Sequence, residues 1–440
     1  MFRFKFALAG AMSAGFAICA LAQNQGGAPT SATSLGSSPI QHVIIIFQEN
    51  RTPDNLFQGL PGADIASSGI NSKGQVIPLQ PEHLQNNYDM SHSHPAFLIS
   101  YDNGKMDRFD RIPSECLPKP CTLPPNPEYF SVYPADVAPY LQMAEQYTFA
   151  DRMFQTNQGP SFPAHQFIIS GTSAPATGSD LFASEEPNPS NVTVGCTAPS
   201  NVTVALIDPS GNESQSMYPC FDHATLTDLL DNAKINWRYY TSSTGTIWTA
   251  PAAISHMRFG PDWNNVVAPQ SKVLHDIANG RLAAVSWVIP TGQESDHADI
   301  SDGTGPSWVA SIVNAVGTSP YWASTAIFIT WDDWGGWYDH VPPPIINSYE
   351  YGFRVPLIVV SPYAKPAYVS HVTHDFGSLL KFIEVTYNLP SLGYADSLAD
   401  DLYDCFNFKQ KPTPFRQIKA PLGAAYFLND KRPPLDPDDD

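Results

Sequence analysis

Short, continuous apolar segments, each bounded by polar residues, limit this chain to few folds. The first runs from His42 to Phe47, reads HVIIIF, and is followed at once by Gln48 and Glu49. Apolar runs of this length without alternation are typical of strands that are buried on both faces, as in parallel sheets. Three further runs have the same character: Ala283 to Ile289, Ala326 to Trp331, and Pro356 to Ser361.

Segments with helical spacing of apolar residues lie between these runs, at Thr225 to Asn232, Ser307 to Val316 and Phe376 to Tyr387. The alternation of strands and helices predicts an α/β fold with right-handed crossovers. A hydrophobic content of 42% is sufficient for a packed core. We expect one domain over residues 39–430, with a polar loop insert near 179–218 and a Pro/Asp tail at 431–440.

The N-terminus has the pattern of a secretory signal peptide. Arg3 and Lys5 precede an apolar run that ends in small residues at Ala22. Residues 23–38 are rich in Gly, Ser, Ala and Gln and read as a flexible leader. No later stretch approaches the roughly 20 continuous apolar residues of a membrane-spanning helix. We therefore expect a secreted or periplasmic protein, cleaved near Ala22, with no transmembrane segment in the mature chain.

Charge and cysteine content limit the partners and the redox setting. The net charge of −19 argues against nucleic acid as the partner, because binding to a phosphate backbone needs clustered Lys and Arg. After export, Cys116 with Cys121 and Cys196 with Cys220 are candidate disulfides, although sequence alone does not fix the pairing. Cys405 is then left over, and we expect it to be buried and inert. A metal-binding role for the cysteines is not expected, since no CxxC or Cys/His ligand spacing is present.

Polar residues follow two of the predicted strands at the point where each strand ends. Glu49 and Asn50 follow the first strand, and Asp332 and Asp333 follow Trp331. Ligands of open α/β sheets bind beyond the carboxyl ends of the strands, so these residues are expected at one edge. A cation between the carboxylates would offset their repulsion. An all-oxygen ligand set favours Ca²⁺, Mg²⁺ or Mn²⁺ over Zn²⁺, whereas the alternative is solvated acidic loop residues.

Ser161 lies in a second informative segment, Gln158 to His165. Gly159 and Pro160 predict a turn, after which a helix begins at Ser161 with Pro163 in its first turn. Free backbone N–H groups at a helix start bind phosphate oxygens. A serine there can attack phosphorus while those groups stabilise the charge, although an ordinary N-cap serine has the same pattern.

Histidines beside acidic residues form a third group. His92 and His94 lie in one predicted loop, His297 follows Asp296 in another, and His340 follows Asp339 just beyond the paired aspartates. A histidine can contact phosphate oxygens or protonate a leaving alkoxide. A single loop histidine is usually a surface residue, but three beside acids favour a functional site.

These segments together resemble the bacterial acid phosphatase and phospholipase C phosphoesterase family, a branch of the alkaline phosphatase-like superfamily. The resemblance spans most of the chain and rests on segments that occur in the family's order: 42–59 (HVIIIFQENRTPDNLFQG), 89–107 (DMSHSHPAFLISYDNGKMD), 159–172 (GPSFPAHQFIISGT), 295–297, 330–344 (TWDDWGGWYDHVPPP) and 351–366 (YGFRVPLIVVSPYAKP). It implies a three-layer α/β/α sandwich with a mostly parallel central sheet and long loop insertions.

The resemblance also assigns roles residue by residue. Glu49, Asn50, Asp332 and Asp333 match the family's metal ligands, and Ser161 matches the nucleophile, which also contacts the metal. His92, His297 and His340 match histidines that contact phosphate or transfer protons, with His94 left as an alternative to His92. His165 stands where the family often has Asn or Arg, so its role is open.

The resemblance leaves the substrate open between two classes of phosphate ester. Family phospholipases commonly carry further β domains, whereas a short tail follows Leu392 here, so phosphate monoesters are expected, hydrolysed through a phosphoserine intermediate. The alternative is a phospholipase C or other phosphodiesterase acting on phospholipid head groups. A non-catalytic secreted protein that binds phosphate ligands is the alternative of a different class. The oligomeric state is not predicted.

Overall fold

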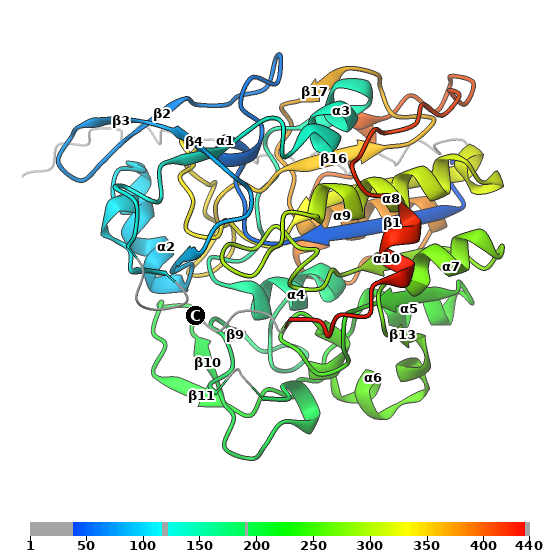
Figure 1. Ribbon diagram of the computed structural model, residues 1–440. Coiled ribbons are helices and arrows are strands. Elements are labelled where there is room, and N and C mark those ends of the chain that lie inside the picture. The colour runs from blue at the N-terminus through cyan, green and yellow to red at the C-terminus, as the bar shows by residue number, and fades with distance from the viewer. Residues whose placement is uncertain (1–37, 117–121, 190–191, 436–440) are drawn as a thin grey trace, which may run out of the picture. The chain divides into compact units, whose positions relative to one another are not determined.

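The computed structural model describes residues 38–116, 122–189 and 192–435 (Figure 1). The predicted signal peptide, residues 1–22, and nearly all of the predicted leader lie outside these ranges, as does Cys121. The centre of the unit that begins at Pro39 is an eight-stranded sheet of order β13-β12-β14-β1-β15-β16-β8-β17. Its strands are β1 (His42–Gln48), β8 (Thr148–Ala150), β12 (Trp237–Tyr240), β13 (Val266–Val267), β14 (Val285–Val288), β15 (Thr325–Trp331), β16 (Leu357–Val360) and β17 (Tyr368–Ser370).

The four apolar runs that predicted strands form β1, β14, β15 and β16, and their side chains are almost entirely buried. Every neighbouring pair in the sheet is parallel except the two pairs made by β16, which is antiparallel to both β15 and β8. The expectation of a parallel strand at Pro356 to Ser361 was therefore wrong. Residues 332–356 contain no crossover helix, so the chain returns through a loop and enters β16 in the opposite direction.

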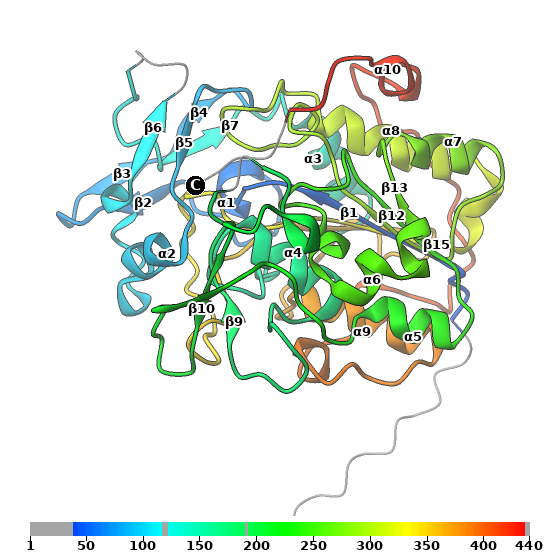
Figure 2. The same cartoon turned by 90° about the horizontal axis from the view of Figure 1, so that it is seen from below.

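Helices cover both faces of this sheet, which gives the expected three-layer α/β/α arrangement (Figure 2). One layer contains α3 (Ala138–Gln146), α7 (Lys272–Ala278), α8 (Gly305–Gly317) and α10 (Ala424–Asn429). The other contains α4 (Ser161–Ser170), α5 (Leu226–Asn232), α6 (Ser255–Phe259) and α9 (Phe376–Tyr387). The three predicted helices correspond to α5, α8 and α9. Among the described residues, no helix has both the length and the apolar composition needed to cross a membrane.

Smaller elements surround one end of the sheet. Two short helices, α1 (Pro53–Leu56) and α2 (His94–Tyr101), accompany three two-stranded sheets: β2 (Ser68–Ile70) with β3 (Val76–Pro78), β4 (Gln80–Glu82) with β7 (Phe130–Val132), and β5 (Tyr88–Met90) with β6 (Ser114–Cys116). We expected a loop insert at 179–218, but the structure contains strands there. β9 (Phe182–Ala183), β10 (Val204–Ile207) and β11 (Gln215–Met217) form an antiparallel sheet within the insert. Buried apolar residues of β10 join the main hydrophobic core and so anchor this small sheet to the rest of the domain.

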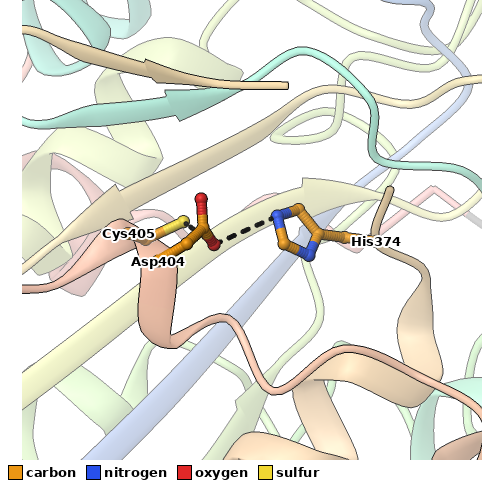
Figure 3. A group of neighbouring side chains, drawn as sticks. All are labelled: His374, Asp404 and Cys405. Carbon is orange, nitrogen blue, oxygen red and sulfur yellow. Dashed lines mark hydrogen bonds and ion pairs between the residues drawn. The ribbon is translucent and has the colours of Figure 1, made fainter. Parts of the chain in front are cut away.

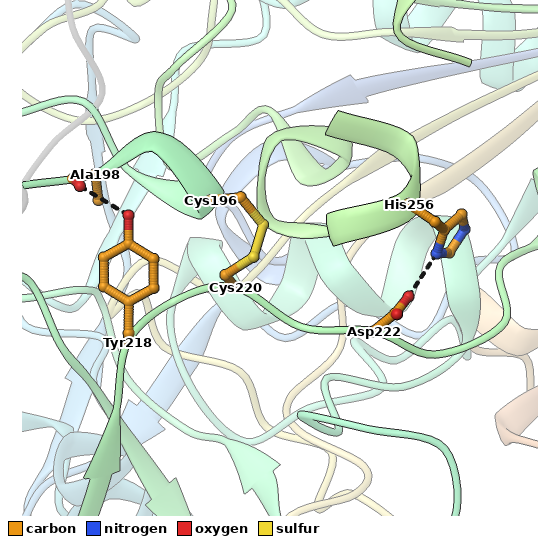
Figure 4. Close-up of a disulfide and its surroundings, with 6 residues drawn as sticks. All are labelled: Cys196, Ala198, Tyr218, Cys220, Asp222 and His256. Carbon is orange, nitrogen blue, oxygen red and sulfur yellow. Dashed lines mark hydrogen bonds and ion pairs between the residues drawn. A yellow bond between two sulfur atoms is a disulfide. The ribbon is translucent and has the colours of Figure 1, made fainter. Parts of the chain in front are cut away.

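A disulfide joins Cys196 to Cys220 and closes the part of the insert that contains β10 and β11 (Figure 4). The side chain of Tyr218 reinforces the closure by donating a hydrogen bond to the carbonyl oxygen of Ala198 at 2.7 Å. Cys405 is buried and free, as expected. The candidate pairing of Cys116 with Cys121 stays a prediction, because Cys121 lies outside the described residues.

Replacing both Cys196 and Cys220 by Ser should lower the free energy of unfolding by about 3 kcal/mol. The reason is the conformational entropy that the unfolded chain regains when a loop with a sequence separation of 24 is opened. Urea unfolding followed by tryptophan fluorescence measures the change. Equal midpoints for the double variant and the wild type would contradict this expectation.

Candidate functional site

The four predicted metal ligands meet at the carboxyl ends of β1 and β15. These strands are parallel neighbours whose last paired residues are Gln48 and Trp331, so Glu49 and Asp332 leave the sheet side by side. The backbone N–H of Asn50 donates to Asp332 Oδ1 at 3.1 Å, and the N–H of Arg51 donates to the carbonyl oxygen of Asp333 at 3.1 Å. Glu49, Asn50, Asp332 and Asp333 are all fully buried. The two strand ends therefore form one connected polar cluster inside the protein.

Backbone conformation brings the two segments into close contact. Asn50 has φ 62°, a left-handed conformation that Asn tolerates better than most residues. Gly335, with φ 59°, packs directly against it, since a Cβ atom at Gly335 would lie 2.5 Å from both Asn50 Cβ and Asn50 O. The N–H of Gly335 also donates to Asp333 Oδ1 at 2.7 Å. Glycine is thus required at 335 both for its conformation and for the approach to Asn50.

Hydrogen bonds orient the side-chain amide of Asn50. His92 Nδ1 donates to the carbonyl oxygen of Met90 at 3.0 Å, which leaves Nε2 of a neutral ring as an acceptor. The side-chain nitrogen of Asn50 lies 3.1 Å from this Nε2 and donates to it. The amide oxygen of Asn50 consequently points away from His92, and it has no hydrogen-bond partner among the described residues.

Three buried oxygens of this cluster lack a hydrogen-bond partner in the described part of the chain: Glu49 Oε2, Asn50 Oδ1 and Asp332 Oδ2. A buried polar atom without a partner costs free energy, and for carboxylates the cost is larger. A divalent cation would satisfy all three, so the residues present fit a metal ion. Carboxylate and amide oxygens suit Ca²⁺, Mg²⁺ or Mn²⁺.

The pKa values of the carboxyl groups reflect the same concentration of charge. Burial, followed by the charges of Asp332 and Asp333, raises the pKa of Glu49 well above its usual range. Burial acts in the same direction on Asp332, but hydrogen bonding to Glu49 and the nearby His165 outweigh it and lower the pKa of Asp332. The opposite shifts reflect a closely spaced pair of carboxyl groups, of which one favours the ionised form and the other the protonated form.

His165 is a member of the cluster whose role the sequence left open. It lies one helical turn after Ser161 on α4, and its Nε2 is 3.3 Å from Glu49 Oε1 and 3.9 Å from Asp332 Oδ2. Complete burial lowers the pKa of His165 to about 4, so the ring is neutral near pH 7. Glu49, His165 and Asp332 together have the geometry of a candidate metal site. The spacing of four residues from Ser161 on a predicted helix is the signal that could have identified His165.

Ser161 is the first residue of α4, as predicted, and its hydroxyl donates to Asp333 Oδ2 at 3.1 Å. The expectation of free backbone N–H groups at this helix start was wrong for the residues that follow. The N–H of Phe162 donates to Glu186 Oε1 at 2.8 Å, Pro163 has no N–H, and the N–H of Ala164 donates to the carbonyl oxygen of Pro160. A carboxylate of the insert thus lies next to the predicted nucleophile, and nothing in the sequence indicated Glu186.

His92 and His297 lie beside one another at this cluster. Their ring centroids are 5.9 Å apart, and His92 Nε2 is 3.9 Å from Asp333 Oδ2. His297 Nδ1 donates to the carbonyl oxygen of Ala298 at 2.6 Å, which fixes the proton on that nitrogen in the neutral ring. Trp248 packs against His297 with ring centroids 6.3 Å apart. Both histidines are therefore buried and oriented next to the strand ends.

His340 and His94 have their described contacts in other clusters. His340 Nδ1 lies 2.8 Å from Asp54 Oδ2, and its Nε2 lies 3.1 Å from Asp64 Oδ1. Although burial alone would lower it, hydrogen bonding to Asp54 and the charge of Asp54 raise the pKa of His340 to about 9. His94 Nδ1 lies 3.0 Å from Glu213 Oε1 of the insert. The structure thus brings His92 to the paired aspartates with His297 beside it, and gives His340 and His94 acidic partners elsewhere.

Comparison with known proteins identifies the family to which this chain belongs. The Phosphoesterase family profile matches residues 40–390 of this chain. The chain belongs to the Phosphoesterase family. This family member is 22% identical to phospholipase C B of Mycobacterium tuberculosis over 441 residues, which covers 85% of this chain and 79% of the relative. It is 23% identical to a non-hemolytic phospholipase C of Pseudomonas aeruginosa over 435 residues, which covers 84% of this chain and 57% of the relative.

Membership of the family establishes the class of reaction: this phosphoesterase is a hydrolase that acts on phosphoester bonds. Among solved structures, a protein of the alkaline phosphatase superfamily from Vibrio parahaemolyticus is 11% identical, with a TM-score of 0.37 over 82% of this chain and 70% of that one. This TM-score is too low for the likeness to support a conclusion.

Replacing Gly335 by Ala should weaken divalent-cation binding, because the added Cβ would push against the backbone of Asn50. Gly59→Ala is the matched control, since Gly59 also has a positive φ but a Cβ there would meet nothing within 4 Å. Both variants should lose about 1–2 kcal/mol of stability from the left-handed backbone. Calorimetric metal titration measures the cation affinity of each variant, and only Gly335→Ala should bind the cation more weakly than the wild type. Equal cation affinity in the two variants would contradict the expected contact.

Replacing His340 by Gln should destabilise the protein mainly at neutral and acidic pH. Since folding raises the pKa of His340 to about 9, its stabilising charge is fully present below its unfolded value of about 6.5 and is lost as the pH rises through about 9. The difference in melting temperature between wild type and variant should thus be larger at about pH 6 than at about pH 10. A difference that does not depend on pH would show that this ion pair does not act as described.

Proposed function

We propose that this chain hydrolyses phosphodiesters in the manner of a phospholipase C, with Ser161 as nucleophile and one divalent cation held by oxygen ligands. The observation that carries the proposal is the hydrogen bond from the Ser161 hydroxyl to Asp333, within the cluster of Glu49, Asn50 and Asp332. This places a potential nucleophile beside the residues that fit a metal ion. The relatives named phospholipase C, which match over most of this chain, favour diesters over the monoesters expected from the sequence.

The proposed reaction has two steps. In the first, Ser161 Oγ forms a bond to phosphorus and passes its proton towards Asp333, while the bond from phosphorus to the leaving alcohol breaks. His297, doubly protonated and held through Nδ1 by the carbonyl oxygen of Ala298, is the proposed donor of its Nε2 proton to that alcohol. His92 holds the amide of Asn50 in place. In the second step, water attacks phosphorus and gives a proton to His297 Nε2, while the bond from phosphorus to Ser161 Oγ breaks and Oγ regains its proton from Asp333.

A bound divalent cation would neutralise the phosphoryl oxygens and favour the ionised form of Ser161. Glu49, Asn50, Asp332 and Asp333 are its proposed ligands, and His165 is a further candidate. The role of His340 as a proton donor stays a prediction. Its contacts to Asp54 and Asp64 give it a second explanation as part of a structural ion-pair cluster.

The charge beside the nucleophile supports a diester substrate. Glu186 accepts a hydrogen bond from the N–H of Phe162, directly after Ser161, and its charge also helps to raise the pKa of Glu49. A phosphate monoester has a second pKa near 6 and carries nearly two negative charges at neutral pH, whereas a diester carries one. Glu186 should therefore repel the monoester more strongly.

The proposal extends to partners and location. A phospholipid head group or another small phosphate ester is the proposed substrate, and nucleic acid is not, because the chain carries a net charge of −19. Secretion or release into the periplasm after cleavage near Ala22 follows from the N-terminal sequence pattern.

The proposal is tested by comparing hydrolysis of p-nitrophenyl phosphorylcholine, bis(p-nitrophenyl) phosphate and p-nitrophenyl phosphate by the secreted form of the protein, with and without added Ca²⁺, Mg²⁺ or Mn²⁺. Diester substrates should have the higher kcat/KM. Ser161→Ala should lower kcat about a thousandfold or more. Ser170→Ala, at the other end of α4, is the matched control and should retain activity.

Glu186→Gln should raise kcat/KM for the monoester relative to the diester by about fivefold to tenfold, since removing one nearby charge changes the repulsion by about 1 kcal/mol. Preference of the wild type for the monoester would return the assignment to a phosphatase. Absence of hydrolysis of all three substrates by metal-loaded protein would instead favour a binding protein. Full activity of Ser161→Ala would exclude the proposed nucleophile.

A further inference from the structure

A second cluster of potential metal ligands lies apart from the strand-end site. His374 follows β17, and Asp404 and Cys405 close a short 3-10 helix, Tyr403–Cys405 (Figure 3). One ligand atom from each residue lies within 4.8 Å of the others. His374 Nε2 is 3.5 Å from Asp404 Oδ1, and Cys405 Sγ is 3.5 Å from the same oxygen. His374 and Cys405 are fully buried.

The two nitrogens of His374 have different surroundings. Nε2 faces Asp404, and the hydroxyl of Ser370 lies 3.3 Å from it. Nδ1 lies 3.2 Å from Asp400 Oδ1. Histidines that bind metals through one ring nitrogen commonly have a carboxylate at the other, which fixes the tautomer and raises the basicity of the ligand. Asp400 is in position for that supporting role.

We propose that His374 Nε2, Asp404 and Cys405 bind a zinc ion, with the hydroxyl of Ser370 or a water as fourth ligand. A nitrogen, a carboxylate oxygen and a sulfur form a ligand set that suits Zn²⁺, whereas the oxygen-rich set at the strand ends suits harder ions. This site was not predictable from the sequence, because His374 and Asp404 are 30 positions apart in the chain and do not form a short Cys/His motif.

The charged groups around the buried sulfur and nitrogen favour a bound cation. Two carboxylates, Asp404 and Asp400, lie beside His374, and Asp404 also contacts the sulfur of Cys405. Zinc binds a thiolate after displacing its proton. The carboxylates of Asp404 and Asp400 are partly exposed, at 23% and 36%, which gives an ion a path to the buried sulfur and nitrogen.

The position of the cluster indicates a structural role. The backbone of His374 pairs with the segment after β8, since its N–H donates to the carbonyl oxygen of Arg152 and its carbonyl oxygen accepts from the N–H of Phe154. The next residue, Asp375, accepts a hydrogen bond from the hydroxyl of Thr156. This segment leads directly to Ser161 at the start of α4. Zinc at His374 would thus hold the segment that carries the proposed nucleophile.

The test uses the full folded protein, stripped with a chelator and titrated with Co²⁺ as a spectroscopic substitute for Zn²⁺. One equivalent of Co²⁺ should produce a thiolate-to-cobalt charge-transfer band in the near ultraviolet, and Zn²⁺ should abolish it by displacement. Cys405→Ser should lose the band, and His374→Gln should bind Zn²⁺ at least about tenfold more weakly. His371→Gln is the matched control, because this histidine is largely exposed and pairs with Asp151 outside the cluster.

The cobalt band also tests the zinc site independently of the proposed function. Asp332→Asn should retain it while losing activity, because Asp332 belongs to the strand-end site. Absence of a thiolate-to-cobalt band in folded wild-type protein would overturn the zinc site without bearing on Ser161, and this outcome does not depend on whether any variant folds. Persistence of the band in folded Cys405→Ser would overturn it as well.

Discussion

The rest of the site depends on one constraint: three carboxylates and an amide are buried at the ends of two neighbouring strands. Glu49, Asp332 and Asp333 lie where β1 and β15 leave the sheet, and their side chains are fully buried. Carboxylates in such a place are stable only with a proton or a cation between them. The left-handed Asn50 and the glycine at 335 allow the two strand ends to approach closely enough to share one ion.

The surroundings of this cluster direct its chemistry. Hydrogen bonds at Asn50 and His92 leave the amide oxygen of Asn50 pointing away from His92. The hydroxyl of Ser161, the first residue of α4, donates a hydrogen bond to Asp333. Glu186 from the insert then adds a negative charge one residue beyond that hydroxyl. The polar strand ends that fit a cation therefore hold the proposed nucleophile, and the insert adds to the charge that a substrate meets.

Much of the central sheet and of the strand-end site could be predicted from local sequence. Unbroken apolar runs predicted β1, β14, β15 and β16, and the polar residues after β1 and β15 predicted which side chains come together, because strand ends of a parallel sheet share an edge. The direction of β16 was not predictable from its own residues, since it depends on the absence of a crossover helix in residues 332–356. Glu186 lies in an insert with no recognisable pattern, and the acidic partners of His340 are 276 and 286 residues away in the chain.

Anomalous diffraction from crystals grown with Mn²⁺ tests the central claim most directly, since it locates the ion without reference to activity. We expect a peak at the ends of β1 and β15, within about 2.0–2.6 Å of oxygens from Glu49, Asn50 and the paired aspartates. The same map shows whether Ser161 or His165 completes the coordination. A well-ordered site without a peak between these residues, in crystals that hold Mn²⁺ elsewhere, would contradict it.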